Sequence, residues 1–336
     1  MLKSNLQVDV RVLDEKSFGA ALQYFTGSKA HNISIRDRAK RMGLKVSEYG
    51  VFDEKDRFVA GETEEDVYKA VGLPWIPPEL RENTGEIESA LNKKLPHLID
   101  VDDIKGDLHI HTAETDGANK IDEIADAAIK MGYEYIAITD HSKAVSIAHG
   151  LDEKRVLKQI EEIDKLNKRF TVLKGIEVDI KVDGSLDLDK DVLNKLDVVV
   201  GAIHSRFNMT EEEMTARIIK AISSGLINII AHPTGRLINE RQPYAVNMIE
   251  IMKSCKKHNV ILELNSYPDR LDLNDIHCKL AKDMGVMVVI STDSNSKFHL
   301  ENIRFGVYTA RRGWLEKGDV LNTRPLKEVL KILIRR

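Results

Sequence analysis

Two histidines separated by one residue stand in the stretch "GDLHIHTAETDG", residues 106–117. Alternate side chains of an extended strand share a face, so His109 and His111 are predicted to point the same way. Imidazole nitrogens placed like this can bind a divalent metal ion, and Asp116 follows in the next loop as a possible carboxylate ligand. A surface histidine pair with no ligand role is the alternative, so the rest of the sequence has to decide.

The elements that must position these residues form a repeating pattern. From Gly106 onward, short β-branched runs alternate with amphipathic helical segments, which is typical of an α/β protein with a parallel sheet. The seven predicted strands are 106–112, 135–141, 170–178, 197–205, 227–233, 260–266 and 286–294. An open doubly wound sheet could be drawn from the same list, but seven similar units favour closure into a barrel.

Residues that could bind metal follow or end six of these strands. The candidates are His109, His111, Asp116, His141, Glu177, His204, His232 and Asp293. In a parallel barrel the carboxyl ends of all strands meet at one mouth. Any single one of these residues could be a hydrogen-bonded polar group, but five of the eleven histidines fall at such positions, which favours a shared metal site.

The donor set indicates the chemistry. Imidazole and carboxylate without thiolate suit Zn²⁺, Mn²⁺ or Fe²⁺. Eight ligands exceed what one ion can use, so we expect two or three divalent ions bridged by a carboxylate such as Glu177. Such a cluster generates hydroxide from bound water and favours displacement at phosphorus. We therefore predict phosphoester hydrolysis with metal-bound hydroxide, and no side chain, as the nucleophile.

Other polar residues near these strand ends could assist. The candidates for binding a substrate phosphate are Arg206, Arg236 and Arg270, each of which could also be a salt-bridged surface residue. Asn265 could orient a metal ligand or begin a turn. Asp140 could orient the neighbouring imidazole or cap the following helix.

The blocks "DLHIHT…DG", "ITDHS", "GIEVDI", "GAIHSRF", "AHPTGR" and "STDS" resemble the PHP (polymerase and histidinol phosphatase) domain, a distorted (β/α)7 barrel with a trinuclear metal site. The resemblance runs from about Lys105 to the C-terminus. It implies three ion sites, which would be formed by His109, His111, Glu177 and Asp293, by Glu177, His204 and His232, and by Asp116 with His141.

One position departs from the family pattern. The third ion of the family usually gains a histidine two residues after the last aspartate, where this sequence has Asn295. An asparagine oxygen is a poorer ligand for Zn²⁺ than an imidazole nitrogen. The third site is therefore expected to be weak, empty, or completed by water or by His299.

Residues 6–52, with the blocks "YFTGS" and "SEYGVF", are similar to the end of the palm and the thumb of bacterial and archaeal family X DNA polymerases, in which a PHP domain follows. On that resemblance Asp9 corresponds to the third palm carboxylate. The other two carboxylates, the fingers and the helix-hairpin-helix segment would lie upstream of these blocks, so no polymerase activity is expected.

We expect three parts: a small α+β thumb-like domain at 1–75, a linker rich in proline and acidic residues at 76–104, and the PHP domain at 105–336. A cationic run in the first part could contact DNA phosphates or form a solvated helix face. Its members are Lys29, Arg36, Arg38, Lys40, Arg41 and Lys45.

The composition is that of an ordinary globular protein, with 42% hydrophobic and 31% charged residues and a formal net charge of −4 over 336 residues. Cys255 and Cys278 are not in a CxxC pair, which argues against a thiolate zinc site. No run approaches the length of a membrane span and the first residues lack the apolar core of a signal peptide, so a cytoplasmic protein is expected.

These observations favour a metal-dependent phosphoesterase acting at DNA ends, as a 3′-to-5′ exonuclease or a 3′-phosphatase. A phosphatase for a small phosphomonoester such as histidinol phosphate is the enzymatic alternative, and a non-catalytic DNA-binding relic is the other. Hydrolysis of carbon–nitrogen bonds, as in amidohydrolase barrels, is less favoured, because the lysine-type or single-aspartate bridging arrangement usual in those sites is not recognisable.

Overall fold

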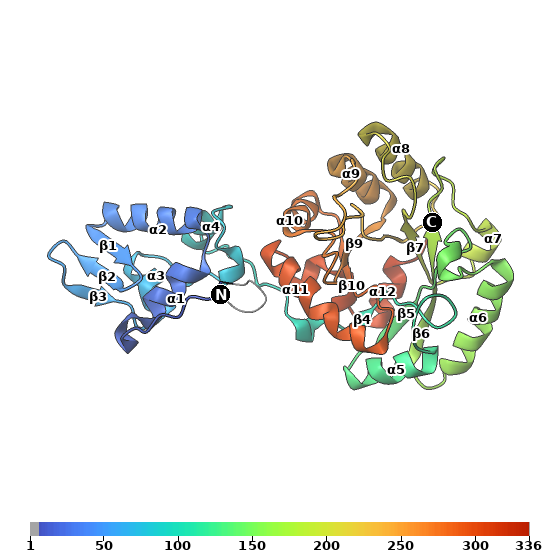
Figure 1. Cartoon of the computed structure of the whole chain (residues 1–336), viewed down its shortest axis with the longest axis horizontal. Helices are drawn as coiled ribbons and strands as arrows, with labels where there is room; N and C mark the ends of the chain where they lie inside the picture. Colours follow the sequence, from blue (N-terminus) through green and yellow to red (C-terminus); the bar gives the residue numbers. More distant parts are fainter. Residues whose placement is uncertain (1–6, 336) are drawn as a thin grey trace. The chain divides into compact units, whose positions relative to one another are not determined.

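The computed structural model describes residues 7–335 and divides into two compact units, one ending at Pro96 and the other beginning at His97 (Figure 1). The N-terminal unit has an antiparallel sheet of order β1-β2-β3. Its strands are β1 (Leu44–Ser47), β2 (Gly50–Asp53) and β3 (Phe58–Ala60). Its helices are η1 (Glu15–Ser17), α1 (Phe18–Thr26), α2 (Lys29–Arg41), α3 (Glu64–Ala70), η2 (Pro78–Leu80) and α4 (Glu86–Leu91).

The "YFTGS" block is the junction between α1 and α2. Ser28 caps α2, because its Oγ accepts a hydrogen bond from the backbone N of His31 at 3.1 Å. Ile35 and Ala39 of α2 are buried together with Val51 of β2. Ala20 of α1 and Val67 of α3 are buried as well, so several helices and the inner face of a short sheet form the core of this unit.

The predicted linker at 76–104 is wrong for its first part. Ile76 and Leu80 are fully buried in the N-terminal unit, and Arg81 forms two hydrogen bonds with Glu64 of α3. Pro77 and Pro78 begin a short 3₁₀ helix, and buried acidic groups are paired within the unit. The segment is therefore ordered, although its composition resembles that of a flexible linker. Ile99, at the other end of the segment, already belongs to the core of the C-terminal unit.

The C-terminal unit has all seven predicted strands, every neighbouring pair parallel, in the order β10-β9-β8-β7-β6-β5-β4. The strands are β4 (Gly106–Asp107), β5 (Tyr135–Ile138), β6 (Thr171–Asp179), β7 (Val198–Ala202), β8 (Ile229–Ile230), β9 (Ile261–Asn265) and β10 (Val288–Ser291). Beyond the ends of β4 and β10, a parallel bridge joins Ile110 to Ser294. This contact between first and last strands nearly closes the sheet, as predicted for a distorted (β/α)7 barrel.

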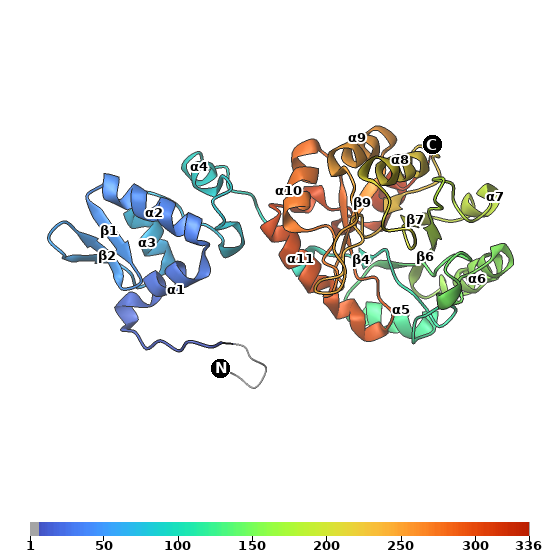
Figure 2. The ribbon, with the colours of Figure 1, turned by 45° about the horizontal axis from the view of Figure 1, so that its top comes forward.

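Helices surround this sheet (Figures 1 and 2). The longer ones are α5 (Ile121–Lys130), α6 (Glu153–Leu166), α8 (Glu211–Ile222), α9 (Met248–His258), α10 (Asp275–Met284) and α11 (Ile303–Arg312). The shorter ones are η3 (Val101–Asp103), η4 (Ser146–Ala148), α7 (Lys190–Leu193), η5 (Lys297–Asn302), η6 (Lys317–Asp319), η7 (Leu321–Thr323) and α12 (Leu326–Ile332). Across residues 7–335, none of the helices combines the length and the apolar character that crossing a bilayer requires.

Two hydrophobic clusters fill the C-terminal unit. The larger one lies between the sheet and the surrounding helices, where the buried face of α5 includes Ile124. The second is formed by inward-facing strand residues such as Val200 and Ile261, with Val329 and Leu333 of the C-terminal segment packed against them. This inner cluster is apolar, and the C-terminal segment packs against it. The polar residues of the barrel interior lie instead near the carboxyl ends of the strands.

Candidate metal centre

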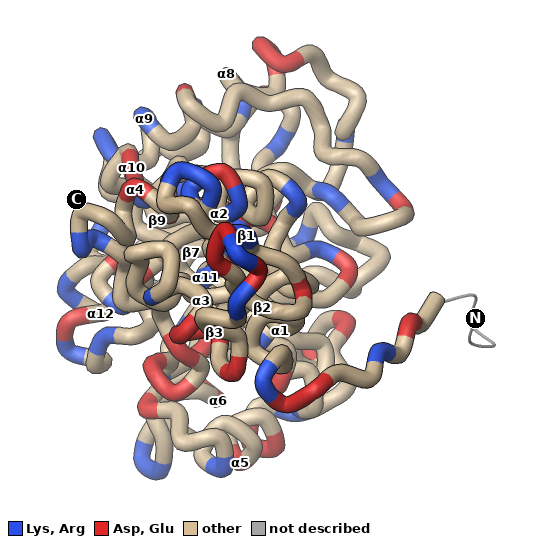
Figure 3. The backbone as a smooth tube through the Cα atoms, turned by 90° about the vertical axis from the view of Figure 1, so that its left-hand side faces the viewer, with Lys and Arg blue, Asp and Glu red and all other residues tan. Residues whose placement is uncertain are grey.

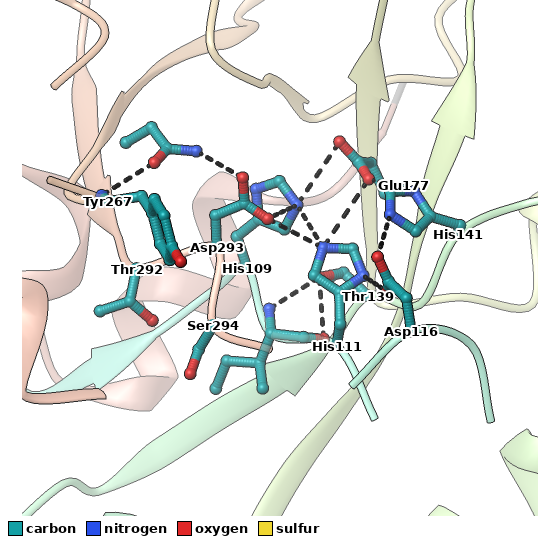
Figure 4. Close-up of polar contacts among 12 residues, drawn as sticks. His109, His111, Asp116, Thr139, His141, Glu177, Tyr267, Thr292, Asp293 and Ser294 are labelled. Atoms are coloured by element: carbon teal, nitrogen blue, oxygen red, sulfur yellow. Dashed lines mark hydrogen bonds and ion pairs between the residues drawn. The ribbon is translucent and has the colours of Figure 1, made fainter. Parts of the chain in front are cut away.

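The predicted ligands converge at the carboxyl ends of the strands (Figure 4). Three groups of three residues can be distinguished, and within each group the ligand atoms lie within 4.8 Å of one another. They are His109, His111 and Asp293; His111, Asp116 and His141; and His141, Glu177 and His204. The eighth candidate, His232, joins them through Glu177, 3.0 Å away. The structure therefore brings all eight predicted ligands into one connected cluster.

Glu177 lies at the centre of this cluster and, unlike the other candidates, inside a strand, β6. Its Oε1 faces the Nε2 atoms of His232 at 3.0 Å, His204 at 3.3 Å and His109 at 3.5 Å. Its Oε2 lies 2.7 Å from His141 Nδ1 and 3.8 Å from His111 Nε2. A carboxylate whose two oxygens face different imidazoles is suited to bridge two ions.

The first group is oriented from behind by a buried carboxylate. His109 Nδ1 lies 2.7 Å from Oε1 of Glu263, so the opposite nitrogen, Nε2, carries the free lone pair when the ring is neutral. That Nε2 faces His111 Nε2 at 3.2 Å and Asp293 Oδ1 at 3.5 Å. The three atoms thus face a common centre.

The two carboxylate oxygens of Asp293 have different partners. Oδ1 faces His111 Nε2 at 3.0 Å. Oδ2 accepts a hydrogen bond from Asn265 Nδ2 at 2.9 Å and lies 3.3 Å from Arg270 Nε. Asn265 also accepts a hydrogen bond from Tyr267 N at 3.0 Å through Oδ1, so it both orients a carboxylate and begins a turn, the two roles that the sequence left open.

His141 and His204 are less buried than the other three imidazoles. His204 Nδ1 lies 3.1 Å from Asp179 Oδ1, which directs Nε2 toward Glu177. His141 Nε2 lies 3.4 Å from Oδ2 of the exposed Asp116. The site of Asp116 and His141, predicted to hold the third ion, is therefore the most open part of the cluster.

Asn295 lies next to the loop that carries Asp116, because its carbonyl accepts a hydrogen bond from Ala118 N at 2.8 Å. Its side-chain Oδ1 is buried and has no hydrogen-bond donor within the described part of the chain. His299 packs edge-on against Tyr267, with 5.6 Å between ring centroids. His299 Nδ1 is also buried without a hydrogen-bond partner among the described residues, so both side chains keep an uncommitted atom that could complete the site of Asp116 and His141.

Asp140 does not act on its neighbour His141 as the sequence suggested, nor does it cap a helix. Its carboxylate accepts hydrogen bonds from Thr112 N at 2.7 Å, Thr115 Oγ1 at 2.5 Å and Gln159 Nε2 at 2.6 Å. Asp140 therefore holds the loop between His111 and Asp116. A buried acid at this position fixes the backbone from which two predicted ligands extend.

The three candidate arginines have different surroundings. Arg206 is exposed. Arg236 donates hydrogen bonds to the carbonyls of Arg270, at 2.7 Å, and Leu271. Arg270, beside Asp293, is thus the candidate that lies against the cluster.

Strong electrostatic coupling accompanies this geometry. Burial disfavours charge on Glu177 and Asp293, yet the surrounding imidazoles hold the pKa of each carboxyl well below its usual range. In the same way burial opposes protonation of His141 and His204, but the nearby carboxylates raise the pKa of His141 to about 10 and that of His204 to about 9. Burial and the charge of Arg270 lower the pKa of His232.

The donor set fits divalent metal ions. His111 Nδ1, His141 Nδ1 and Glu177 Oε2 are buried and make no hydrogen bond of acceptable geometry with any described residue. Buried polar atoms of this kind are normally satisfied, so their convergence indicates an electrophile that they share. Nitrogen and carboxylate donors without thiolate suit Zn²⁺, Mn²⁺ or Fe²⁺.

Sequence analysis missed two carboxylates that support the ligands, Glu263 and Asp179. Both are buried and both lie inside strands. Asp179 is two residues after Glu177, so the period of a strand places the two on one face. Glu263 has a similar signal, since it is two residues before Asn265 in an apolar run.

The cationic run of the N-terminal unit lies on and beside α2 (Figure 3). Lys29, Arg36 and Arg41 are exposed, while Arg38 donates to the carbonyl of Val71 at 2.6 Å and is only partly exposed. Lys45 lies 3.5 Å from Asp56. Arg38 thus has a structural role, and the other cations are available at the surface.

Comparison with known proteins identifies both units. Residues 21–82 match the family model described as DNA polymerase beta thumb, and residues 107–267 match the PHP domain. The "DNA polymerase/3′-5′ exonuclease PolX" of Bacillus subtilis is 44% identical over 332 residues, which cover 98% of this chain and 58% of the relative. The chain thus spans little more than half the length of that relative.

A "Probable phosphatase" of Thermoanaerobacter sp. strain X514 is 29% identical over 239 residues, which cover 67% of this chain and 94% of the relative. The solved structure of a histidinol phosphate phosphatase from Lactococcus lactis, in complex with zinc, L-histidinol and phosphate, covers 61% of this chain and 93% of its own, with 15% identity and a TM-score of 0.45. Residues 107–267 thus form a segment of the PHP domain family, and a segment of the DNA polymerase beta thumb family, residues 21–82, precedes it.

Proposed function

We propose that the chain is a metal-dependent phosphoesterase that hydrolyses phosphoester bonds at DNA ends, as a 3′-to-5′ exonuclease or a 3′-phosphatase. The observation that carries this proposal is Glu177, whose two oxygens face five imidazoles from four different chain segments. A buried acid of this kind is suited to share its charge between two cations. The name of the Bacillus subtilis relative supports DNA as the substrate class.

When bound, two or three divalent ions would supply a water of lowered pKa and positive charge opposite the phosphoryl oxygens. The side chains of the chain prepare that site. Glu263 fixes the ring of His109 and Asp179 fixes that of His204, and in each case Nε2 remains free. His109, His111, Glu177 and Asp293 would hold one ion, Glu177, His204 and His232 a second, and Asp116 with His141 a third.

The N-terminal unit supplies the feature that favours DNA over a small phosphomonoester. Exposed cations on α2 can attract a polyphosphate strand without reading its sequence. We expect reversal of Lys29, Arg36 and Arg41 to glutamate to weaken binding of an oligonucleotide and to flatten its salt dependence. Hydrolysis of p-nitrophenyl phosphate should not change, because that substrate has a single phosphate and does not need the cations of α2.

The decisive assay gives the chain Mn²⁺ or Zn²⁺ and a set of substrates: single-stranded and 3′-recessed oligonucleotides, a 3′-phosphorylated oligonucleotide, p-nitrophenyl phosphate and histidinol phosphate. Release of nucleotides or phosphate from DNA, lost in Glu177→Gln and retained in Glu250→Gln on the exposed side of α9, is the expected result. Hydrolysis of the small substrates alone would overturn DNA as the substrate and favour the small-molecule phosphatase. Binding of DNA without hydrolysis under any metal would favour the non-catalytic relic.

Polymerase activity is not part of the proposal. Asp9, which resembles a palm carboxylate, lies exposed beside Gln7, whose Nε2 is 3.3 Å from Asp9 Oδ2. The lack of nucleotide addition stays a prediction, and a primer-extension assay on the chain tests it.

A further inference from the structure

The exposed aromatic side chains of the C-terminal unit lie on two consecutive elements. Within the described residues of this unit, two aromatic side chains are exposed, Phe298 of η5 at 73% and Tyr308 of α11 at 51%. Phe305, about one helical turn before Tyr308, is half-buried. Single apolar residues on a surface are common, but exposed rings that gather on neighbouring elements indicate a surface that a ligand covers.

This surface begins beside the metal centre. Asn265 donates through Nδ2 to Asp293 Oδ2 at 2.9 Å and accepts from the backbone N of Tyr267 at 3.0 Å (Figure 4). The ring of Tyr267 in turn packs edge-on against His299 of η5, with 5.6 Å between ring centroids. Because η5 and α11 follow the last strand, they begin at the mouth of the barrel, and α11 runs away from it. The rings therefore lead from a predicted metal ligand to the outer wall of the barrel.

Cations stand next to two of these rings. Lys297 Nζ lies 5.7 Å from the ring centroid of Phe298, and Arg304 Cζ lies 4.8 Å from that of Phe305. Lys297 also lies 3.2 Å from Oε1 of Glu123, so its charge is partly balanced. Arg304 is exposed and has no carboxylate partner within the described part of the chain. The surface thus combines free positive charge with accessible aromatic faces.

The chemistry of this surface matches single-stranded nucleic acid. Residues 297–312 contain four Lys or Arg residues and one acidic residue, in a chain whose formal net charge is −4. Unpaired bases stack on aromatic side chains whatever their sequence, and neighbouring cations bind the backbone phosphates. A protein partner would instead need a continuous apolar area, but the polar side chains of Glu301 and Arg304 lie between the exposed rings in the sequence.

From these observations, and resting on the proposed function, we propose that η5 and α11 bind the single-stranded segment of DNA that leads to the 3′ end under hydrolysis. Bases of this segment stack on Phe298 and Tyr308, with Phe305 between them, and Arg304 binds a backbone phosphate. We call these four residues the ring surface. It holds the strand in line with the metal centre and makes a long single strand a better substrate than a short one.

The first experiment measures binding of a fluorescein-labelled single-stranded oligonucleotide by fluorescence anisotropy, in chelator so that the strand is not cleaved. Phe298→Ala and Tyr308→Ala should each raise the Kd about 5- to 100-fold, because each removes a stacking face. Phe298→Trp and Tyr308→Trp keep an aromatic face and should bind as tightly as the unsubstituted chain. Ile249→Ala, which removes an exposed apolar side chain of α9, is the matched control and should leave the Kd unchanged.

The second experiment tests the charge and the need for unpaired bases. Arg304→Ala should weaken binding and lower the salt dependence of the Kd by about one phosphate contact, whereas Lys253→Ala on α9 should change neither. A blunt duplex, whose bases are already stacked on one another, should bind Phe298→Ala and the unsubstituted chain equally. Equal losses of affinity for duplex and single strand would overturn stacking.

The third experiment follows hydrolysis with Mn²⁺ as strand length is varied. The unsubstituted chain should have a lower KM for a long single strand than for a trinucleotide. In the double variant Phe298→Ala with Tyr308→Ala, the KM for the long strand should rise to that for the trinucleotide. A preference for long strands that survives in the double variant would overturn the ring surface.

The remaining outcomes separate this inference from the proposed function. Unchanged affinity for single strands in the double variant would overturn the ring surface, even if the unsubstituted chain hydrolyses DNA. If sedimentation shows that the unsubstituted chain self-associates through these rings while DNA binding does not depend on them, the surface belongs to a second copy and the inference is wrong. Loss of binding in the double variant would support the ring surface, and it would do so even if the unsubstituted chain hydrolysed no substrate and the proposed function failed.

Discussion

The carboxylate of Glu263 lies 2.7 Å from Nδ1 of His109, on the side of the ring that faces away from the cluster. Its other oxygen accepts a hydrogen bond from the backbone N of His232, also at 2.7 Å. One buried acid thus fixes a ring and a backbone that belong to two different predicted ion sites. The geometry of both sites should depend on a residue that touches neither ion.

Glu263→Gln is expected to weaken metal binding about 10- to 100-fold, as loss of a carboxylate behind a ligating histidine usually does. The amide keeps the size of the side chain but loses the negative charge that favours the His109 tautomer. Titration with Zn²⁺ or Mn²⁺ in the presence of a competing chelator measures the change. Glu250→Gln is the control, and equal affinities in the two variants would contradict the role given to Glu263.

Asn295→His should increase the number of tightly bound ions per chain. The Oδ1 atom of Asn295 is buried without a donor in the described structure, and the Asn295 backbone is hydrogen-bonded to the loop of Asp116. An imidazole nitrogen at this position would add a better ligand to the site of Asp116 and His141. Elemental analysis after gel filtration counts the ions. Asn295→Ala is the matched variant, and the same ion content in all three proteins would show that position 295 does not contribute.

Metal uptake should release protons. The pKa of His141 is raised to about 10 and that of His204 to about 9 by nearby carboxylates, against burial, so both rings are charged at neutral pH before metal binds. A metal ion needs neutral imidazoles, so its affinity should rise with pH through this range. Calorimetric titrations in two buffers of different ionisation enthalpy give the number of protons released. A value of zero near neutral pH would contradict the prediction.

The same groups make the stability of the metal-free chain depend on pH. Both folded-state pKa values lie above the usual value for histidine, so the stabilisation is fully present below that usual value and is lost as pH rises through about 9 and then 10. We expect the Tm of the C-terminal unit, measured in chelator, to fall between neutral pH and pH 10. Saturating metal should reduce this fall, because bound imidazoles are already neutral.

The N-terminal unit depends on a buried ion pair. Arg81 is fully buried and donates to Glu64 at 2.5 and 2.9 Å. Arg81→Met leaves the Glu64 charge without its partner, and the free energy of unfolding of this unit should fall by about 3–5 kcal/mol. Urea unfolding followed by the fluorescence of Trp75 measures it. Lys45→Met, which removes an exposed pair with Asp56, should change stability by less than about 1 kcal/mol.

The sequence predicted the seven strands and all eight ligands because strand runs and strand ends leave local signals. It did not predict how short β4 is. After Asp107, the hydroxyl of Thr139 accepts a hydrogen bond from the backbone N of Ile110 at 2.9 Å, so a side chain takes the place of a ladder partner. Glu263 and Asp179 were not predicted, because their roles depend on contacts with His109 and His204, which lie in other segments of the chain.

Roles that depend on distant contacts could not be predicted. Nothing in the local sequence of Arg236 or Arg270 tells that one guanidinium binds the backbone of the other's loop, since the two residues are far apart in the chain. The same holds for Arg81, whose proline-rich surroundings suggested a linker while its partner Glu64 lies in an earlier helix.

His109 and His111 follow the first strand of the barrel, and Asp293 follows the last. The bridge between Ile110 and Ser294 therefore also brings together the residues of the first predicted ion site. A ribosome that has finished only six of the seven strands therefore presents a chain without that site. The predicted ion site, and the proposed hydrolysis that depends on it, should therefore form only after the last strand has been synthesised.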